Sequence, residues 1–234
     1  MIDVAVLIPA LDEEAALPAV LAAIPREGRG WRVSEVVVAD NGSRDRTREV
    51  AGMAGAAVVR EPRRGYGAAC LAGLAHLRHR PPGVVAFLDG DGSSDPAELG
   101  LLLGPMVRDE ADLVIGSRVL GHPEPGSLTP VQAFGNRLAT ALLAVLYGGR
   151  ATDLGPYRVI RWEALETLRM RDRGYGWTVE MQARALAARQ RCSEVPVTNR
   201  RRRGGRSKVA GTLRGAVGAG VKILFTIARV RLGG

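Results

Sequence analysis

Two acidic residues, Asp89 and Asp91, follow an apolar segment at positions 84–88 in the stretch VVAFLDGDGSSDP. Residues two apart on an extended chain point to the same side, so both carboxylates can face one point beyond the end of a strand. Such a pair suits a hard divalent cation, Mg²⁺ or Mn²⁺. Because Asp, Gly and Ser are also common in solvated turns, this stretch alone leaves a metal site and a plain turn both open.

The first 118 residues alternate strand-like and helix-like segments. Apolar runs predict strands at positions 4–8, 36–39, 57–59, 84–88 and 113–115. Helices are expected between them, at positions 12–24, from 47 onward, at 67–77 and at 96–107. This alternation is typical of a mostly parallel sheet with helices on both faces. Such sheets bind ligands at the carboxyl ends of their strands, where Asp40, Asp89 and Arg118 stand.

Beyond position 118 the pattern changes. Loops are expected at 122–130 and 151–157, helices at 132–146, 162–168 and 178–188, and a strand at 192–198. The last segment, 209–232, has helical periodicity, with an apolar side and a basic side formed by Arg214, Lys222 and Arg229. This C-terminal amphipathic helix either packs against the body of the protein or lies on a membrane surface, and the periodicity leaves both open.

The charge is concentrated in the tail. Of the 33 lysines and arginines, ten follow Glu194, the last acidic residue, which leaves 23 basic against 24 acidic residues up to that point. The tail therefore predicts an anionic partner: phosphate groups, an anionic lipid surface or nucleic acid. Nucleic acid is disfavoured, because only 4% of the residues are aromatic and none is interleaved with the tail arginines for base stacking.

The N-terminus lacks a basic leader, and no uncharged apolar run approaches the ~20 residues of a membrane span. We therefore expect a cytoplasmic protein that contacts the inner face of the membrane at most peripherally. A P-loop NTPase is excluded because the chain has no GxxxxGK(S/T) motif. A nucleotidyltransferase usually carries a glycine-rich basic loop after its first strand, whereas here that loop is PALDEE, acidic and free of glycine.

Several motifs occur in an order that resembles glycosyltransferase family 2. They are VLIPALDEE, VVVADNGSRDRT, EPRRGYGAACLAG, DGD at 89–91 and VIGSR at 114–118. The resemblance implies an α/β protein with the GT-A fold: a nucleotide-binding, mostly parallel sheet sandwiched by helices, with a C-terminal amphipathic helix. It also implies one domain over 1–208, in which 1–118 bind the nucleotide-sugar and 119–208 bind the acceptor, followed by the helix in 209–234.

Within that family the chain is most similar to polyprenyl-phosphate sugar transferases of the dolichol-phosphate mannosyltransferase type. The similarity lies in TDLGPYRVI at 152–160 and EVPVTNRRRRGGRSK at 194–208. It implies inverting transfer of a sugar from a UDP- or GDP-linked donor to a polyprenyl phosphate, with Mg²⁺ or Mn²⁺ bound by Asp89 and Asp91. The metal motif continues Gly92-Ser93-Ser94, which departs from those relatives and leaves a second acceptor class open. That class is a hydroxyl group of a saccharide or small molecule, used by a soluble family member. The oligomeric state is left undetermined.

The resemblance assigns roles to single residues. Asp91, Arg118 and Asp153 are the expected catalytic residues. Asp153 would act as the base for a hydroxyl acceptor or orient the acceptor, whereas a phosphate acceptor is already anionic and needs little base. The nucleotide-sugar is expected to contact Pro9, Ala10, Asp12, Glu13, Asp40, Gly65, Gly67, Asp89, Gly90, Arg202 and Lys208. The acceptor is expected to contact Arg118, Arg137, Trp177 and Ser207.

Each of these roles has a purely structural alternative. Asp40 can stabilise the turn that follows its strand. Asp153 can pair with Arg150 or Arg158, and Trp177 can pack in the core. The tail arginines can form a solvated basic patch.

Overall fold

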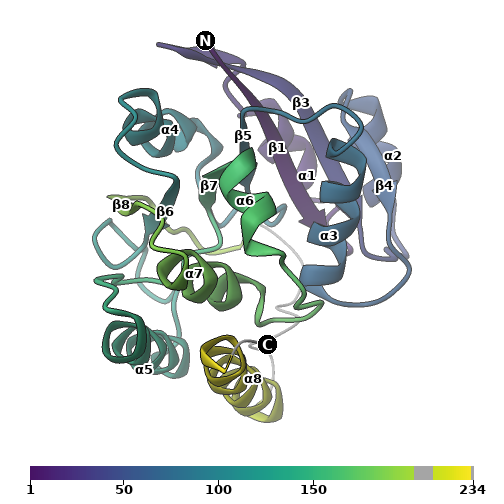
Figure 1. The fold of residues 1–234 in the computed structure, drawn as a ribbon. Coiled ribbons are helices and arrows are strands. Elements are labelled where there is room, and N and C mark those ends of the chain that lie inside the picture. The colour runs from purple at the N-terminus through teal and green to yellow at the C-terminus, as the bar shows by residue number, and fades with distance from the viewer. Residues whose placement is uncertain (203–212, 233–234) are drawn as a thin grey trace.

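The computed structural model describes residues 1–202 and 213–232, and within them the chain forms one eight-stranded sheet (Figure 1). Neighbouring strands follow the order β2-β3-β1-β5-β7-β6-β8, and β4 also pairs with β3. The strands are β1 Ile2–Ala10, β2 Glu27–Gly28, β3 Trp31–Asp40, β4 Ala57–Arg60, β5 Val84–Phe87, β6 Leu113–Ser117, β7 Arg158–Arg161 and β8 Cys192–Pro196. The expected halves 1–118 and 119–208 thus share a single sheet, because β7 and β8 belong to the second half.

The sheet is mostly parallel, as the sequence predicted. Strands β4, β3, β1 and β5 run parallel to one another, and so do β6 and β8. Strand β7 lies between β5 and β6 and is antiparallel to both. The sequence did not indicate β7, because its four residues begin and end with arginine, a pattern unlike the apolar runs of the other central strands.

Helices cover both faces of the sheet (Figure 1). They are α1 Leu17–Ala22, α2 Thr47–Met53, α3 Tyr66–Leu77, α4 Leu99–Val107, α5 Pro130–Tyr147, α6 Trp162–Leu168, α7 Trp177–Ala187 and α8 Leu213–Arg231. Alternate side chains of β1 point to opposite faces. Ile8 packs with Leu17 of α1 in one core, and Leu7 packs with Leu74 of α3 in the other.

The helix expected over 12–24 begins only at Leu17. The backbone N–H groups of Asp12, Glu13 and Glu14 instead donate to side chains of the turn after β3. Their acceptors are Ser43 Oγ, Thr47 Oγ1 and Asp45 Oδ2. Asp12 has a left-handed backbone with φ of 53°. The first turn of the chain is therefore held by contacts some 30 residues away in sequence, which local periodicity cannot reveal.

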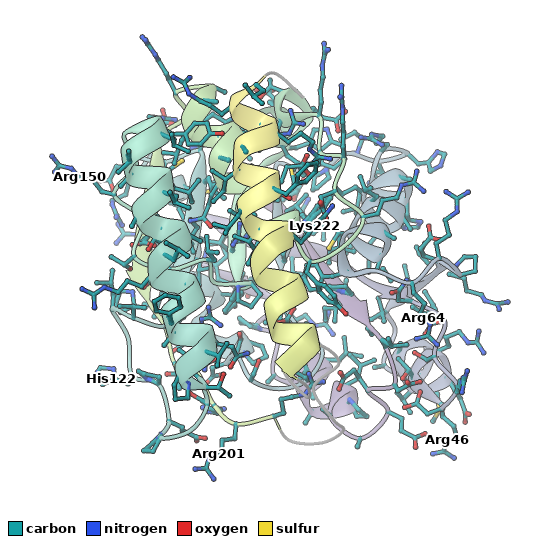
Figure 2. All side chains as sticks on the ribbon, turned by 90° about the horizontal axis from the view of Figure 1, so that it is seen from below. Arg46, Arg64, His122, Arg150, Arg201 and Lys222 are labelled. Carbon is teal, nitrogen blue, oxygen red and sulfur yellow. The ribbon has the colours of Figure 1, made fainter. Side chains whose placement is uncertain are left out.

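The C-terminal helix α8 packs on the body of the protein, against α5 and α7. Ile227 and Val230 are buried there in a cluster with Leu143 of α5 and Val179 of α7. Figure 2 shows α5 and α8 side by side along one face of the molecule. Of the two arrangements expected for this helix, the structure shows packing on the body. No helix in the described ranges is long and apolar enough to cross a membrane.

Two cations of α8 are directed toward the body. Lys222 Nζ lies 2.9 Å from Asp172 Oδ2, and Arg229 Nη2 lies 3.1 Å from Glu180 Oε1. Both carboxylates are buried. A buried carboxylate needs a partner because an uncompensated charge in the interior is costly. Lys222 and Arg229 therefore anchor the helix, in addition to its apolar contacts.

Candidate active site

A cavity of about 300 Å³ opens at the carboxyl ends of β1, β3 and β5. Parallel strands bring these ends to one edge of the sheet, and the residues that follow each strand form the cavity wall. The N-terminus of α3 and the segment at 200–202 complete it. The predicted residues that line it are Pro9, Ala10, Glu13, Gly65, Asp89, Gly90, Asp91 and Arg202.

Asp89 and Asp91 both line this cavity, as their spacing predicted. Tyr66 Oη donates to Asp89 Oδ1 at 3.1 Å, and the Ser93 N–H donates to Asp91 Oδ1 at 2.9 Å. Burial and the nearby Asp91 carboxylate raise the pKa of Asp89 to about 7. Burial also raises the pKa of Tyr66 well above its usual value, so the phenol stays protonated and remains the donor.

Arg202 connects the tail to these carboxylates. Its Nη2 donates to Glu13 Oε1, and its Nη1 lies 3.3 Å from Asp91 Oδ2. Two residues earlier, Arg200 pairs with Asp95 at 2.5 Å, which attaches the same segment to the acidic turn. Arg202 thus lines the cavity beside Asp91, and its contact with the nucleotide-sugar stays a prediction. Ser207 and Lys208, also predicted to bind ligand, lie outside the described residues.

The carboxylate pair fits a divalent cation that arrives with its substrate. In residues 1–202 and 213–232, no group of three or more His, Cys, Asp or Glu side chains could hold a metal. Mg²⁺ is usually bound by one or two carboxylates together with substrate phosphates and water, not by a complete protein cage. Burial and, after it, the Asp91 charge raise the pKa of Asp89, and a divalent cation would offset both by favouring the ionised carboxylate.

Arg118 and Asp153 form a second charged group beside the cavity. Arg118 Nε donates to Asp153 Oδ2 at 2.8 Å and Nη2 donates to Oδ1 at 2.7 Å, while the Arg118 backbone N–H also donates to Oδ2 at 2.8 Å. The Asp153 side chain is 0% exposed. The partners considered from the sequence, Arg150 and Arg158, are both wrong. Burial alone would lower the pKa of Arg118, but the bonds to Asp153 outweigh it and raise that pKa.

The loop that carries Asp153 is held from several sides. Glu194 accepts from the backbone N–H groups of Thr152 and Asp153. Asn136 of α5 donates to the carbonyl of Thr152 and accepts from the N–H of Leu154. These bonds fix the backbone on both sides of Asp153, and Asp153 in turn fixes the guanidinium of Arg118.

Arg158 also holds this loop, and its side chain is completely buried. Its guanidinium donates to the carbonyls of Leu154, Gly155 and Thr178. Burial lowers the pKa of Arg158 to about 10, so the group is still charged at neutral pH. Arg158 is buried at this position because its guanidinium provides hydrogen-bond donors to carbonyl groups that would otherwise have none.

Three residues predicted to contact the nucleotide-sugar do not line the cavity. Asp12 accepts from the N–H of Arg44, and Asp40 Oδ1 accepts from the N–H of Ser43. Asp40 therefore stabilises a turn. Its Oδ2 is buried without a hydrogen-bond partner in the described part of the chain, so a ligand contact there stays a prediction. Gly67 is required by packing, since a Cβ would lie 2.0 Å from the Asp172 carbonyl oxygen.

Two further residues, Trp177 and Arg137, were predicted to contact the acceptor. Trp177 is 1% exposed and packs in the core, with its ring centroid 6.0 Å from that of Phe87. The predicted acceptor contact of Trp177 is therefore wrong. Arg137 lies on the exposed side of α5, next to Asn136 in sequence. Its contact with the acceptor stays a prediction.

The sequence reasoning missed residues that shape the cavity wall. Asn41 donates to the carbonyls of Glu61 and Arg63 and accepts from the N–H of Gly65, so it holds the loop before α3. Tyr66 stands in the motif EPRRGYGAACLAG, but local spacing does not indicate its hydrogen bond to Asp89. Tyr175 also lines the cavity. The one available signal was the position of Asn41, directly after Asp40 at a strand end.

Comparison with known proteins gives the family. A sequence model described as Glycosyl transferase family 2 matches residues 5–169, more than half of the chain. The chain belongs to glycosyltransferase family 2. The matched span includes Asp89, Asp91 and Asp153. The family predicted from the motifs is thus confirmed, and this family 2 member is a glycosyltransferase.

Two relatives match along most of their length. An uncharacterized glycosyltransferase of Mycobacterium tuberculosis is 42% identical over 215 residues, which cover 92% of this chain and 93% of the relative. An undecaprenyl-phosphate mannosyltransferase of Micrococcus luteus is 32% identical over 232 residues, with 89% and 88% covered.

A solved structure shows the same fold. It is glucosyl-3-phosphoglycerate synthase from Mycobacterium tuberculosis in complex with Mn²⁺, uridine diphosphate and phosphoglyceric acid. The TM-score is 0.78 at 23% identity, and the match covers 98% of this chain and 78% of that one. At this identity the likeness establishes the fold, and the predicted GT-A fold is confirmed.

Proposed function

We propose that this glycosyltransferase moves a sugar, with inversion, from a UDP- or GDP-linked donor to a polyprenyl phosphate. The observation that carries the proposal is the state of Asp153, which is buried with both oxygens bonded to Arg118. The acceptor end therefore presents the Arg118 guanidinium. A hydroxyl acceptor would instead need a free base at this position, to remove its proton. A phosphate monoester is already anionic and is recognised by such a cation.

The donor end would receive the charge that transfer creates. The acceptor oxygen bonds to the anomeric carbon, and the bond from that carbon to the diphosphate breaks, so the diphosphate leaves with the electron pair. Asp89 and Asp91 would hold Mg²⁺ or Mn²⁺, which supplies Lewis-acid stabilisation of that charge. Arg202 adds a cation at the same carboxylates and is itself held by Glu13. Tyr66 orients Asp89.

At the acceptor end, Arg118 would bind the phosphate. Its bonds to Asp153 use Nε and Nη2 and do not involve Nη1. Asp153 acts as a positioning residue, because it fixes the plane of the guanidinium through two bonds at once. The positive charge of Arg118 opposes the rise in the pKa of Asp89, so the two ends are within electrostatic reach of one another.

The relatives support this choice of substrates. The Micrococcus relative is named an undecaprenyl-phosphate mannosyltransferase, and undecaprenyl phosphate is a polyprenyl phosphate. The structurally similar synthase contains Mn²⁺ and uridine diphosphate, in keeping with a metal and a nucleoside-diphosphate donor here. A polyprenyl chain is anchored in a membrane, so the expected peripheral position at its inner face remains a prediction of the same proposal.

The test is a transfer assay with paired acceptors. The full chain is incubated with UDP- and GDP-sugars and either a short polyprenyl phosphate or the matching polyprenol, with Mg²⁺, Mn²⁺ or EDTA. Mass spectrometry should detect a glycosylated polyprenyl phosphate and the free nucleoside diphosphate, and EDTA should abolish both. The polyprenol, which differs only by the phosphate, should not react.

A hydroxyl acceptor is the alternative. Transfer to the polyprenol, or to saccharides from a panel but not to the polyprenyl phosphate, would contradict a phosphate acceptor. That result would favour a hydroxyl acceptor. The assignment of the donor would still stand after that result, because release of the nucleoside diphosphate is measured separately from the identity of the glycosylated acceptor.

A further inference from the structure

Helix α5 exposes an apolar stripe on its outer side. Val131, Phe134, Leu138 and Val145 are spaced three, four and seven residues apart, which places them along one side of a helix. Phe134 is 70% exposed and Val145 is 81% exposed. The buried residues of α5, Ala139 among them, lie on the opposite side. The stripe is therefore not part of the side by which α5 packs on the body of the protein.

Helix α8 has a similar outer side. Phe225 is 57% exposed and Leu232 is 87% exposed, and Leu224 is also exposed, while Ile227 and Val230 face the core. Both α5 and α8 pack on α7 and on each other, so their outer stripes lie on the side away from α7. Figure 2 shows the two helices next to each other at this surface. We call this surface the α5–α8 face, formed by Val131, Phe134, Leu138, Val145, Leu224, Phe225 and Leu232.

The charged residues of the two helices that form the α5–α8 face have one sign. Neither Pro130–Tyr147 nor Leu213–Arg231 contains an acidic residue. Arg137 and Arg231 are exposed on the two helices, whereas Lys222 and Arg229 are occupied by buried carboxylates. Exposed aromatic and aliphatic side chains with basic neighbours and no acidic ones are typical of a surface that enters an anionic lipid interface.

The position of the face also suits a lipid. Asn136 projects from the inner side of α5 to the loop at 152–154, which carries Asp153 and so holds Arg118. The outer side of the same helix, two residues away in sequence, carries Phe134 and Leu138. The face therefore borders the acceptor end of the site.

We propose that the α5–α8 face docks on an anionic lipid bilayer, with Phe134 and Phe225 inserted among the lipids and the exposed arginines on their headgroups. A second copy of the chain is a poorer occupant, because pairing this face with itself would bring like charges together without any acidic partner. The docking does not depend on the acceptor assignment, since vesicle binding is measured without substrate.

The experiment is flotation of the full chain with vesicles of phosphatidylcholine, alone or with about 30% phosphatidylglycerol. The wild-type chain should float with the anionic vesicles. The variant Phe134→Glu with Phe225→Glu should bind them about tenfold more weakly or worse. The matched control is Met53→Glu with Leu101→Glu, which changes two exposed apolar residues on α2 and α4, and its binding should equal that of the wild-type chain. Thermal melts confirm that each variant folds.

A second readout avoids any loss of folding. Single Phe134→Trp and Phe225→Trp variants should show a blue-shifted tryptophan emission with anionic vesicles, relative to Leu101→Trp. Absence of flotation by the wild-type chain, or equal flotation of the Phe134→Glu, Phe225→Glu variant, would overturn the proposal. So would light scattering that shows a wild-type dimer broken by that variant, with no binding to vesicles, because the face would then belong to a second copy.

Discussion

The donor end and the acceptor end of the site treat their carboxylates in opposite ways. At the donor end, Asp89 and Asp91 share one cavity, and burial together with the nearby Asp91 charge raises the pKa of Asp89 to about 7. At the acceptor end, Asp153 is fully buried and has both oxygens bonded to Arg118. The donor carboxylates retain the capacity to bind a cation that arrives with a substrate, while Asp153 has already been neutralised by the chain itself.

This difference teaches how one sheet edge supports two kinds of chemistry. A carboxylate beside a second carboxylate is suited to hold a metal, whereas a carboxylate bonded through both oxygens to one arginine is suited to orient that arginine. Asp153 is the most deeply buried of the three, and an arginine that bonds both of its oxygens offsets that burial.

The largest effect is expected at the donor end. Asp91→Asn should lower kcat by about 10³-fold, because the diphosphate would leave without a properly held cation. The measurement is nucleoside diphosphate release at saturating donor. Asp109→Asn, which changes an exposed carboxylate outside the cavity, is the control and should stay near the wild-type rate. A loss below tenfold in Asp91→Asn would remove the metal site from the mechanism.

A smaller loss is expected at the acceptor end. Asp153→Asn should lower the transfer rate by about 10²-fold, because Arg118 loses its orientation but keeps its charge. Combining it with Arg118→Lys should add little, since both changes break the same pair. Transfer rates of the two single variants and the double variant complete the cycle. A loss as large as that of Asp91→Asn, with additive effects, would instead assign Asp153 the role of a base.

The raised pKa of Asp89 predicts a pH-dependent metal affinity. Protons compete with the cation for this carboxylate, so Mn²⁺ binding should weaken about tenfold between about pH 8 and pH 6. Calorimetric titration of Mn²⁺ in the presence of uridine diphosphate measures this change. Tyr66→Phe removes a bond that favours the ionised form and should move the transition to higher pH. The same profile in an Asp89→Asn variant would show that another group titrates.

The smallest effects are expected from the two asparagines that hold the loops of the donor end and the acceptor end. Asn41→Ala should raise the KM for the donor about fivefold, because the loop at Gly65 loses its hydrogen bonds. Asn136→Ala should lower the transfer rate by a similar factor and leave the donor KM unchanged, since it supports the loop of Asp153. Steady-state kinetics with varied donor distinguish the two. Identical effects on KM would mean that the ends are not separate units.

Much of the fold followed from local patterns. The apolar runs of β1 and β5 and the bounds of α6, Trp162–Leu168, were readable because burial on both faces and helical periodicity are properties of neighbouring residues. The same holds for the pair Asp89 and Asp91, whose common direction depends only on their spacing at a strand end. The boundary of α1 and the whole of β7 were not readable, because contacts with distant segments outweigh the local signal there.

The family, the α/β class and the common direction of Asp89 and Asp91 could be read from the sequence, since each of these is carried by residues close together along the chain. Only the tertiary structure decided which groups are partners. The contact of Arg202 with Glu13 spans 189 residues, that of Tyr66 with Asp89 spans 23, and that of Arg118 with Asp153 spans 35. Such pairs form when the sheet brings strand ends together, and no spacing along the chain encodes them. That is why Asp153 could be placed at the site from its motif, while its state as the fixed partner of an arginine could not.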